Sequence, residues 1–368
     1  MASHVQRQIS ASEKFGNAIA ILKTVISALI TLPTVSSATN GANWSFKRKA
    51  IVSFLWNSTI LNRREALLAA SPTTGQAIHA ECAECEKFGF QLSTTVISCG
   101  SFPDATLHEI QLPSSSPPGK GEGNVFLYFH GGGYRNPIVG TGHVPLVLEA
   151  ARAAECEKVI FLEYTLTLRM QYPGQLVQAA YALKTMLERG LRPENIIVGG
   201  DSAGGNLALA LLAHLKKPLQ EAPLVEGFGE GGKLRGVVLL SPWVSNTTHA
   251  SSFTENKHKD YISSENMHIF VDLWRPRNEI YADFINAPGS RDFWDSVPAE
   301  KMFIVAGGFE ALRDDIRDVA ARLERAMGEE LRFVEAEGEV HVQCVVDVAS
   351  GEMPGRSHAA LMKWCGEL

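Results

Sequence analysis

Strand-length apolar runs alternate with helical patterns along the latter part of the chain. The apolar runs lie at 125–129, 158–166, 195–198, 236–240, 302–306 and 331–335, and the clearest helical patterns lie at 175–189, 203–217 and 311–327. Strands that are apolar throughout are buried on both faces, because helices cover the sheet to which they belong. The alternation therefore predicts an α/β fold with a mainly parallel central sheet flanked by helices.

The 368 residues divide into four stretches by pattern. Residues 1–85 show helical patterns without strand alternation, and we expect an N-terminal helical cap segment there. Residues 86–244 and 301–368 hold the two parts of the α/β core. Residues 245–300 lack strand signals but are rich in aromatic side chains, so we expect a helical cap insertion over the edge of the sheet.

Charge and composition exclude two classes of protein. The 34 basic and 40 acidic side chains leave a net charge of -6 without a long run of one sign, so no basic surface attracts nucleic acid. With 45% hydrophobic and 20% charged residues, the chain is not predominantly disordered.

The six cysteines are too few and too scattered for a disulfide scaffold. Cys82 and Cys85 form a CxxC pair, but a zinc site needs a second pair of ligands that the sequence does not offer. We expect free thiols, no metal and no organic cofactor. Free thiols favour a cytoplasmic location, and association with the endoplasmic reticulum membrane or secretion stays open.

Residues 16–32 are largely apolar, and three interpretations apply to them. Lys23 interrupts the stretch, which falls a little short of the ~20 residues that a membrane span requires. Fifteen mostly polar residues precede it, which argues against a signal peptide. We favour an amphipathic helix that is buried or forms part of the cap. A membrane-associated helix or a signal sequence remains as an alternative.

The sequence Gly200-Asp201-Ser202-Ala203-Gly204 follows an apolar run and precedes a helical pattern. That context is the one a nucleophile elbow requires, because the sharp turn from strand to helix exposes the serine hydroxyl. The small flanking residues avoid collisions with the neighbouring strand and helix. Ser202 is therefore the candidate nucleophile.

A second glycine-rich segment supports the same chemistry. His130-Gly131-Gly132-Gly133-Tyr134 follows the apolar run at 125–129, and its backbone amides have no side-chain cover. The spacing of a dinucleotide-binding loop is absent. We expect the amides of Gly131, Gly132 and Ala203 to form an oxyanion hole.

With both motifs present, the chain resembles the hormone-sensitive lipase family of α/β-hydrolases. The resemblance rests on HGGGY at 130–134, GDSAGG at 200–205, YPGQLVQAAYAL at 172–183, SPW at 241–243 and GGFEALRDD at 307–315. It covers about two thirds of the chain and implies a serine carboxylesterase with an α/β-hydrolase fold.

The resemblance also places the other two members of a catalytic triad. Where the family has the aspartate of D-x-L-x-D, this sequence has Glu310, with Asp314 or Asp315 as the fallback. A glutamate is chemically adequate, since the acid needs only to orient the imidazole and stabilise its cation. His341 follows the apolar run at 331–335, where the family has its base, whereas His130 resembles a brace for the glycine loop.

The family cap implies a substrate pocket, and the 245–300 stretch is rich in aromatic residues. Tyr134, Trp243, Phe253, Tyr261 and Trp274 are candidates to line it, although packing in the core explains each of them as well. The apolar N-terminal stretch and the glutamate resemble fungal members that deacetylate sterols or secondary metabolites. We expect the substrate to be a short acyl, acetyl-like ester of a bulky apolar small molecule.

Two other functions remain open at this point. One is a biosynthetic hydrolase or acyl transferase that releases a thioester- or lactone-bound product with the same triad. The other is a non-catalytic small-molecule receptor, against which the presence of His341 argues. The oligomeric state cannot be inferred from the sequence.

Overall fold

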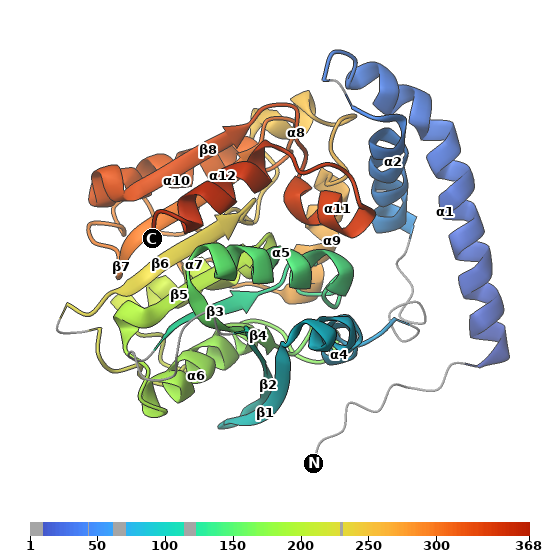
Figure 1. Cartoon of the computed structure of the whole chain (residues 1–368). Coiled ribbons are helices and arrows are strands. Elements are labelled where there is room, and N and C mark those ends of the chain that lie inside the picture. Colours follow the sequence, from blue (N-terminus) through green and yellow to red (C-terminus); the bar gives the residue numbers. More distant parts are fainter. Residues whose placement is uncertain (1–9, 43, 62–70, 114–122, 229–230) are drawn as a thin grey trace.

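One sheet of eight strands runs through the described part of the protein, and helices cover both of its faces (Figure 1). The computed structural model describes residues 10–42, 44–61, 71–113, 123–228 and 231–368. The strands are β1 Gln91–Cys99, β2 Phe102–Gln111, β3 Asn124–Phe129, β4 Cys156–Glu163, β5 Ile196–Asp201, β6 Leu234–Leu240, β7 Ala299–Gly307 and β8 Leu331–Ala336.

The strand order is β1-β2-β4-β3-β5-β6-β7-β8. All pairs from β4 to β8 are parallel, and β2 is antiparallel to both β1 and β4. The predicted α/β fold with a mainly parallel sheet is therefore confirmed.

The helices of the described residues are α1 Ala11–Ala38, α2 Phe46–Leu61, α4 Thr74–Cys85, α5 Gly140–Ala153, α6 Gly174–Glu188, α7 Ala203–Lys216, α8 Ser251–Glu255, α9 Ser264–Trp274, α10 Arg313–Met327, α11 Gln343–Ser350 and α12 Arg356–Cys365. Three short 3₁₀ turns are η1 Glu86–Phe88, η2 Pro193–Asn195 and η3 Gly328–Glu330.

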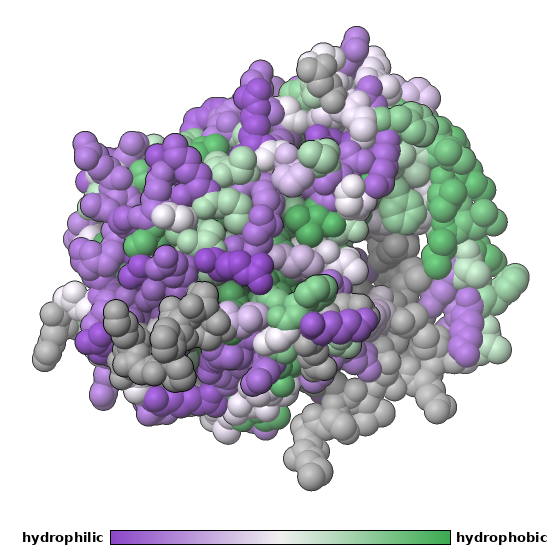
Figure 2. Space-filling view, in the orientation of Figure 1, coloured by the Kyte–Doolittle hydropathy of each residue, from purple (hydrophilic) through white to green (hydrophobic). Residues whose placement is uncertain are grey.

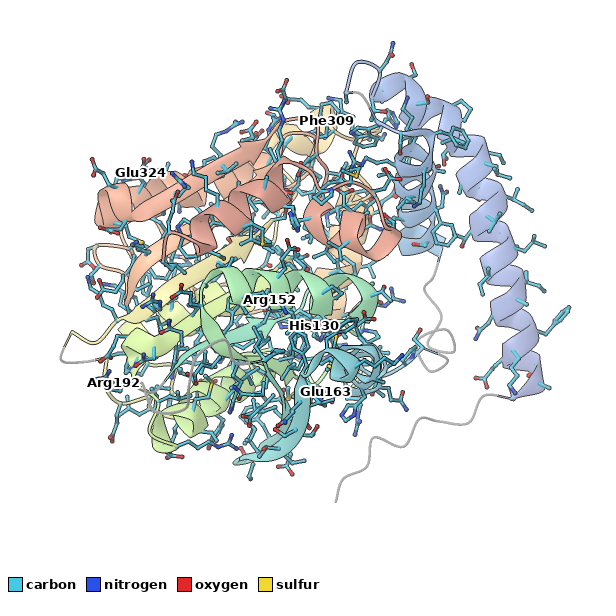
Figure 3. The ribbon with its side chains drawn as sticks, viewed as in Figure 1. His130, Arg152, Glu163, Arg192, Phe309 and Glu324 are labelled. Carbon is cyan, nitrogen blue, oxygen red and sulfur yellow. The ribbon has the colours of Figure 1, made fainter. Side chains whose placement is uncertain are left out.

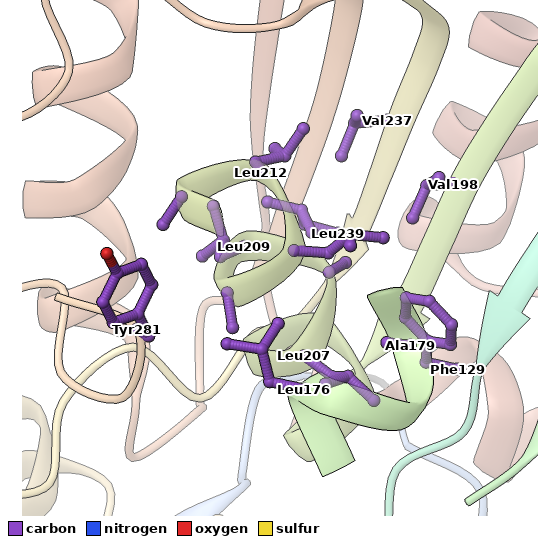
Figure 4. Packing of buried hydrophobic residues seen from close by; sticks show 14 of the residues in the cluster. Phe129, Leu176, Ala179, Val198, Leu207, Leu209, Leu212, Val237, Leu239 and Tyr281 are labelled. Carbon is purple, nitrogen blue, oxygen red and sulfur yellow. The ribbon is translucent and has the colours of Figure 1, made fainter. Parts of the chain in front are cut away.

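The core consists of two apolar layers, one on each face of the sheet. Alternate residues of β3 point into opposite layers, because side chains along a strand alternate in direction. Helices α6, α7 and α10 contribute to the first layer, and α5 and α12 to the second. Figure 4 shows Leu207, Leu209 and Leu212 of α7 in the first layer. Each buried leucine contributes about 1.5–3 kcal/mol, so α7 is firmly held behind the residue that precedes it.

The 245–300 stretch is less helical than predicted. Only α8 and α9 are helices, and the remaining residues of the stretch form turns and extended segments. Pro276 disfavours a helical conformation at Arg275, and Arg275 has a positive φ of 53° directly after α9. The hairpin of β1 and β2 was not predicted, and β4 ends at Glu163 rather than at 166.

Helix α4 packs on the core, although the sequence places it in the cap segment. Ile78 and Cys82 belong to the core layer that α5 also contributes to. Thr74, its first residue, lies with Oγ1 3.1 Å from Nε2 of His130. The core therefore begins near residue 74 rather than at 86. Residues 1–9, 43 and 62–70 of the predicted cap segment lie outside the described residues.

Helices α1 and α2 pack against each other, and the turn between them contacts the loops that follow β7 and β8. Trp44 donates from Nε1 to the carbonyl of Gly338 at 2.7 Å, and its ring lies 6.1 Å from that of Phe309. Figure 3 shows Phe309 beside this turn. Arg48 of α2 forms an ion pair of 2.8 Å with Asp347 of α11. These contacts place α2 next to α11, at the end of the sheet where the strands β5 to β8 terminate (Figure 1).

Candidate active site

Ser202 alone makes the turn from strand to helix, because β5 ends at Asp201 and α7 begins at Ala203. Its backbone angles are φ 52° and ψ -117°, a conformation that costs roughly 1–3 kcal/mol in a residue other than glycine. The Ser202 amide donates to the carbonyl of Leu240 in β6 at 2.9 Å. The neighbouring strand thus stabilises a turn that projects the hydroxyl from the end of the sheet.

The glycines of this turn are required by close approach. A Cβ at Gly204 would lie 1.9 Å from the carbonyl oxygen of Phe129 in β3, and a Cβ at Gly200 would lie 2.3 Å from the carbonyl oxygen of Gly204. No side chain fits at either position without moving backbone. The motif therefore encodes contact between α7 and its two adjoining strands.

The three side chains predicted to act together form a chain in which His341 lies within hydrogen-bonding distance of both Ser202 and Glu310. His341, in the loop between β8 and α11, places Nε2 2.9 Å from Oγ of Ser202. Its Nδ1 lies 2.7 Å from Oε1 of Glu310, which follows β7. With its proton on Nδ1, the imidazole donates to the carboxylate and accepts the serine hydroxyl.

Glu310 is completely buried, and hydrogen bonds satisfy its second oxygen. Oε2 accepts the hydroxyl of Ser241 at 2.8 Å and the amide of Gly307 at 2.8 Å. The same Ser241 oxygen accepts the amide of Val342 at 3.0 Å. These bonds fix the orientation of the carboxyl group that faces His341.

Asp260 of the 245–300 stretch holds both of the loops that meet here. Its Oδ1 accepts the backbone amide of His341 at 3.2 Å, and Oδ2 accepts the amide of Ala311 at 2.7 Å. Burial raises the pKa of Asp260 to about 7, and the nearby Glu310 adds to the rise. Burial alone would lower the pKa of His341, but the Glu310 and Asp260 carboxylates raise it above its usual value.

The prediction that Gly131 supplies an oxyanion-hole donor is wrong. Its amide donates to Oδ1 of Asp201 at 2.8 Å, so this N–H is already bound. Asp201 is buried and also accepts the hydroxyl of Tyr128 at 3.0 Å. Burial would raise the pKa of Asp201, but His143, with Nε2 3.1 Å from Oδ1, keeps the pKa below its usual value.

Two other amides of the glycine loop remain available. No described residue accepts a hydrogen bond from the N–H of Gly132 or Gly133. Both residues border the cavity that contains Ser202. The amide of Ala203 is the first of α7, so no carbonyl of that helix accepts it. An oxyanion at this point can therefore accept hydrogen bonds from the backbone amides of Gly132, Gly133 and Ala203.

His130, labelled in Figure 3, is a buried support for the loop. Its ring stacks on that of Tyr164 with centroids 4.6 Å apart, and Nδ1 lies 2.6 Å from the carbonyl of Gly131. Burial, together with His143, lowers the pKa of His130 to about 4. A neutral, packed imidazole agrees with the expected role as a brace.

A cavity of about 490 Å³ opens above Ser202. Its walls are mostly apolar, and they come from α2, the α8–α9 region, α9, α11 and the glycine loop. The apolar lining residues are Ile51, Leu55, Pro137, Val139, Ile262, Phe270, Val342, Val345, Val346 and Ala349.

Of the five aromatic residues predicted to line the pocket, only Tyr261 does so among the described residues. Its hydroxyl donates to the carbonyl of His341 at 2.9 Å. The other four, Tyr134, Trp243, Phe253 and Trp274, are buried in the core. Rings of three of them pack together, with centroids of Tyr134 and Trp274 4.5 Å apart and those of Trp243 and Trp274 5.2 Å apart. These four aromatic residues therefore pack in the core and do not line the pocket as predicted.

Comparison with known proteins agrees with this geometry. A family model described as the alpha/beta hydrolase fold matches residues 126–345. The chain belongs to the α/β-hydrolase family. The hydrolase is also similar to an esterase from the bacterial hormone-sensitive lipase family, with a TM-score of 0.59 and 22% sequence identity over 88% of this chain and 98% of that one. The predicted resemblance to hormone-sensitive lipases is confirmed.

Two curated relatives are similar to parts of the hydrolase. An esterase of Acinetobacter venetianus is 29% identical over 140 residues, which cover 38% of this chain and 42% of the relative. An acetyl-hydrolase of Streptomyces hygroscopicus is 28% identical over 204 residues, which cover 54% and 62%. The hydrolase thus spans less than two thirds of the length of either relative.

Sequence reasoning missed several polar residues that support the site of this hydrolase. These residues include Ser241, Asp260 and His143, which lie far from the triad motifs in the sequence. Asp201 belongs to the elbow motif, but the motif does not indicate that its side chain binds the glycine loop. Only the position of Ser241 within SPW offered a signal. In the described ranges no group of three or more His, Cys, Asp or Glu side chains is arranged so that it could hold a metal ion, and the six cysteines are free. The expected absence of a metal stays a prediction.

Proposed function

We propose that the protein is a serine carboxylesterase. The observation that carries the proposal is the continuous pair of contacts from Ser202 Oγ to His341 Nε2 at 2.9 Å and from His341 Nδ1 to Glu310 at 2.7 Å. In this arrangement, the imidazole removes the serine proton as the oxygen attacks an ester carbonyl. The two relatives named as an esterase and an acetyl-hydrolase support the same reaction class.

The amides of Gly132, Gly133 and Ala203 stabilise the tetrahedral oxyanion in this proposal. Each such donor contributes about 10²- to 10³-fold to the rate. Protonated His341 then donates to the leaving alcohol, and a water molecule attacks the acyl-enzyme by the same route. Glu310 orients the imidazole throughout through Oε1, while Oε2 accepts hydrogen bonds from the Ser241 hydroxyl and the Gly307 amide.

The shape of the cavity supports a short acyl group on a bulky apolar alcohol. Phe270 borders the cavity, and Trp243 lies behind it with ring centroids 6.4 Å apart. This aromatic cluster fills the space beyond Phe270, so the acyl side near the serine is short. The apolar walls of α2 and α11 leave the larger space for the alcohol. Sterols and secondary metabolites have alcohols of this kind.

Replacement of Ser202 tests the reaction. Ser202→Ala should lower kcat for p-nitrophenyl acetate by about 10⁴- to 10⁶-fold, and it should abolish labelling by a fluorophosphonate. The midpoint of thermal unfolding serves as the control for folding. Retention of more than a tenth of the activity, or labelling at another residue, would contradict the assignment. Absence of labelling in the native protein would favour a receptor.

A series of p-nitrophenyl esters tests the substrate class. With acyl chains of increasing length, kcat/KM should fall steeply after the shortest members, because the space beside Phe270 is limited. Acetate esters of bulky alcohols should be hydrolysed at rates similar to that of p-nitrophenyl acetate. A preference for long-chain triglycerides would contradict this part of the proposal and leave the serine mechanism intact.

A further inference from the structure

The polarity of α1 is the reverse of that expected for a helix in water. The residues that face the protein are Asn17, Ala20, Thr24, Ala28 and Val35, spaced by three, four or seven positions, and four of the five are small or polar. A helix on the surface of a globular protein normally turns its large apolar side chains toward the core. The helix predicted over residues 16–32 is present as part of α1 and packs on α2, but it is mostly exposed rather than buried.

Polar groups join α1 to α2 along this inward stripe. The hydroxyl oxygens of Thr31 and Ser53 are 2.6 Å apart. The amide of Asn57 donates to Thr31 Oγ1 at 2.8 Å, and Ser53 donates to the carbonyl of Ala28 at 2.7 Å. Small residues that let helices approach, joined by hydroxyl and amide hydrogen bonds, are typical of helix pairs in lipid.

Large apolar side chains occupy the outward face. Phe15, Ile19, Ile21, Leu22, Val25, Ile26, Leu29 and Ile30 are all exposed, several by more than half of their surface. Figure 2 shows the resulting hydrophobic edge along α1, and Figure 3 shows side chains of α1 pointing away from the rest of the protein. Between Phe15 and the end of α1, Lys23 is the only charged residue. Such a continuous apolar surface marks an interaction site.

We propose that this outward face of α1 lies in a lipid bilayer. The helix is apolar and long enough to cross a membrane, by length and composition, and only 22% of its most apolar window is buried. However, α1 packs along α2, which α11 joins to the catalytic body. This attachment places α1 flat in the interfacial region rather than across the bilayer. Lys23 extends its ammonium group to the headgroups.

The bilayer surface then lies beside the entrance to the active site. An apolar hollow of about 350 Å³ between α1 and α2 is lined by residues that include Leu29, Phe54 and Ile51. Ile51 also borders the cavity above Ser202. An ester dissolved in the membrane can therefore pass along α2 to the serine. This step rests on the proposed esterase function and specifies its substrate class as a membrane-dissolved ester with a hydrophobic alcohol.

Flotation with vesicles tests the membrane contact. The full chain is mixed with phosphatidylcholine vesicles and compared with the triple variant Leu22→Glu, Ile26→Glu, Ile30→Glu, all at exposed positions outside the hollow. The matched control carries Val96→Glu, Leu224→Glu and Met353→Glu, which add the same charge at exposed apolar positions on other elements. The native and control proteins should float with the vesicles, and the bound fraction of the α1 variant should fall at least tenfold.

Two results would overturn the membrane contact. One is that the native protein stays in the aqueous fraction. The other is that the native protein is a dimer without lipid, does not float, and becomes a monomer in the α1 variant. The second result would assign the apolar face to another copy of the chain.

Hydrolysis of two esters tests the delivery route separately. The α1 variant should hydrolyse p-nitrophenyl acetate in water at the native rate, whereas its hydrolysis of hexadecyl acetate in vesicles should fall at least tenfold. Equal rates of native protein and variant on the vesicle ester would refute delivery from the bilayer. If the native protein hydrolysed neither ester, the proposed function would fail, while flotation would still judge the membrane contact.

Discussion

The hydroxyl of Ser241 donates to Glu310 at 2.8 Å and at the same time accepts the amide of Val342 at 3.0 Å. One buried side chain thus fixes the acid and the loop that carries His341. Ser241 itself has a positive φ of 46° directly after β6, so its position is set by the backbone as well as by its hydrogen bonds.

Replacement of Ser241 by alanine should lower kcat by about 10- to 100-fold with little change in KM. The loss corresponds to the roughly 1–3 kcal/mol that one unsatisfied buried group costs. Ser252→Ala is a matched control, because Ser252 donates a buried hydrogen bond of 2.6 Å to Ala311 without touching Glu310. Equal losses of kcat in both variants would show a general structural effect instead of positioning of the acid.

The rate should fall on the acid side as His341 becomes protonated, since only the neutral imidazole accepts the serine proton. Because the pKa of His341 is raised above 6.5, the midpoint of the fall in kcat/KM should lie above pH 6.5. Glu310→Gln removes the main raising influence and leaves burial, so the midpoint should shift to lower pH. The rate above the midpoint should drop by about 10⁴-fold. A midpoint that moved upward would contradict the role of Glu310.

Truncation of Phe270 to alanine should widen the range of acyl chains that the protein accepts. Its ring borders the cavity and would lie within 2.5 Å of a Cβ on Gly133, so it closes the cavity beside the glycine loop. We expect kcat/KM for butyrate and hexanoate esters to rise relative to acetate by at least tenfold. Phe253→Ala is the control, because Phe253 is buried outside the cavity. An unchanged chain-length profile would place the acyl group elsewhere.

Removal of the Tyr134 hydroxyl should affect stability and leave substrate binding unchanged. This hydroxyl donates to Asn206 at 2.8 Å inside the core. Tyr134→Phe should lower the midpoint of thermal unfolding by about 2–5 °C, with KM for p-nitrophenyl acetate unchanged. Tyr261→Phe should instead lower kcat, because the Tyr261 hydroxyl donates to the backbone of His341. A changed KM in Tyr134→Phe would restore the predicted role in the pocket.

Asp315→Asn should stabilise the protein above neutral pH. Burial raises the pKa of Asp315 from 3.8 to about 7, and the nearby carboxylates of Asp283, Asp314 and Asp318 add to the rise. The folded protein therefore holds a proton that the unfolded chain releases. This stabilisation is complete below pH 3.8 and is lost as pH rises to about 7.

The asparagine variant has no such loss. Its advantage in the midpoint of thermal unfolding should therefore grow between about pH 4 and 7 and then stay constant. Asp292→Asn, at an exposed position, is the control. Parallel curves for the native protein and Asp315→Asn would contradict the raised pKa.

The parallel part of the sheet and the turn at Ser202 could be predicted from the sequence, because local patterns encode them, whereas Glu310 and His341 were placed by the resemblance to hormone-sensitive lipases. Buried parallel strands appear as apolar runs, and the elbow needs glycine at fixed spacing from Ser202. The hairpin of β1 and β2 was missed because β1 lies at the sheet edge, where several of its residues are exposed and the apolar pattern is interrupted.

Other features depend on contacts that no local pattern contains. A row of glycines indicates backbone amides without side-chain cover. It cannot show that the amide of Gly131 already donates a hydrogen bond to the Asp201 carboxylate. Aromatic residues such as Trp243 and Trp274 look the same in a sequence whether they pack together or contact a ligand. The reversed polarity of α1 becomes visible only when α2 identifies the inward face.

The bonds that Asp260 makes to the backbones of His341 and Ala311 bear on how proteins with this fold acquire new specificity. The 245–300 stretch cannot be exchanged as an independent unit. Its Asp260 holds the loops of His341 and Glu310 in place, and other residues of the stretch form a wall of the pocket. A chimera in which the whole stretch is exchanged to obtain a new substrate range would have a lower kcat as well as an altered substrate specificity. Exchange of only the residues that follow Tyr261, with Asp260 retained, should change the substrate specificity and preserve kcat.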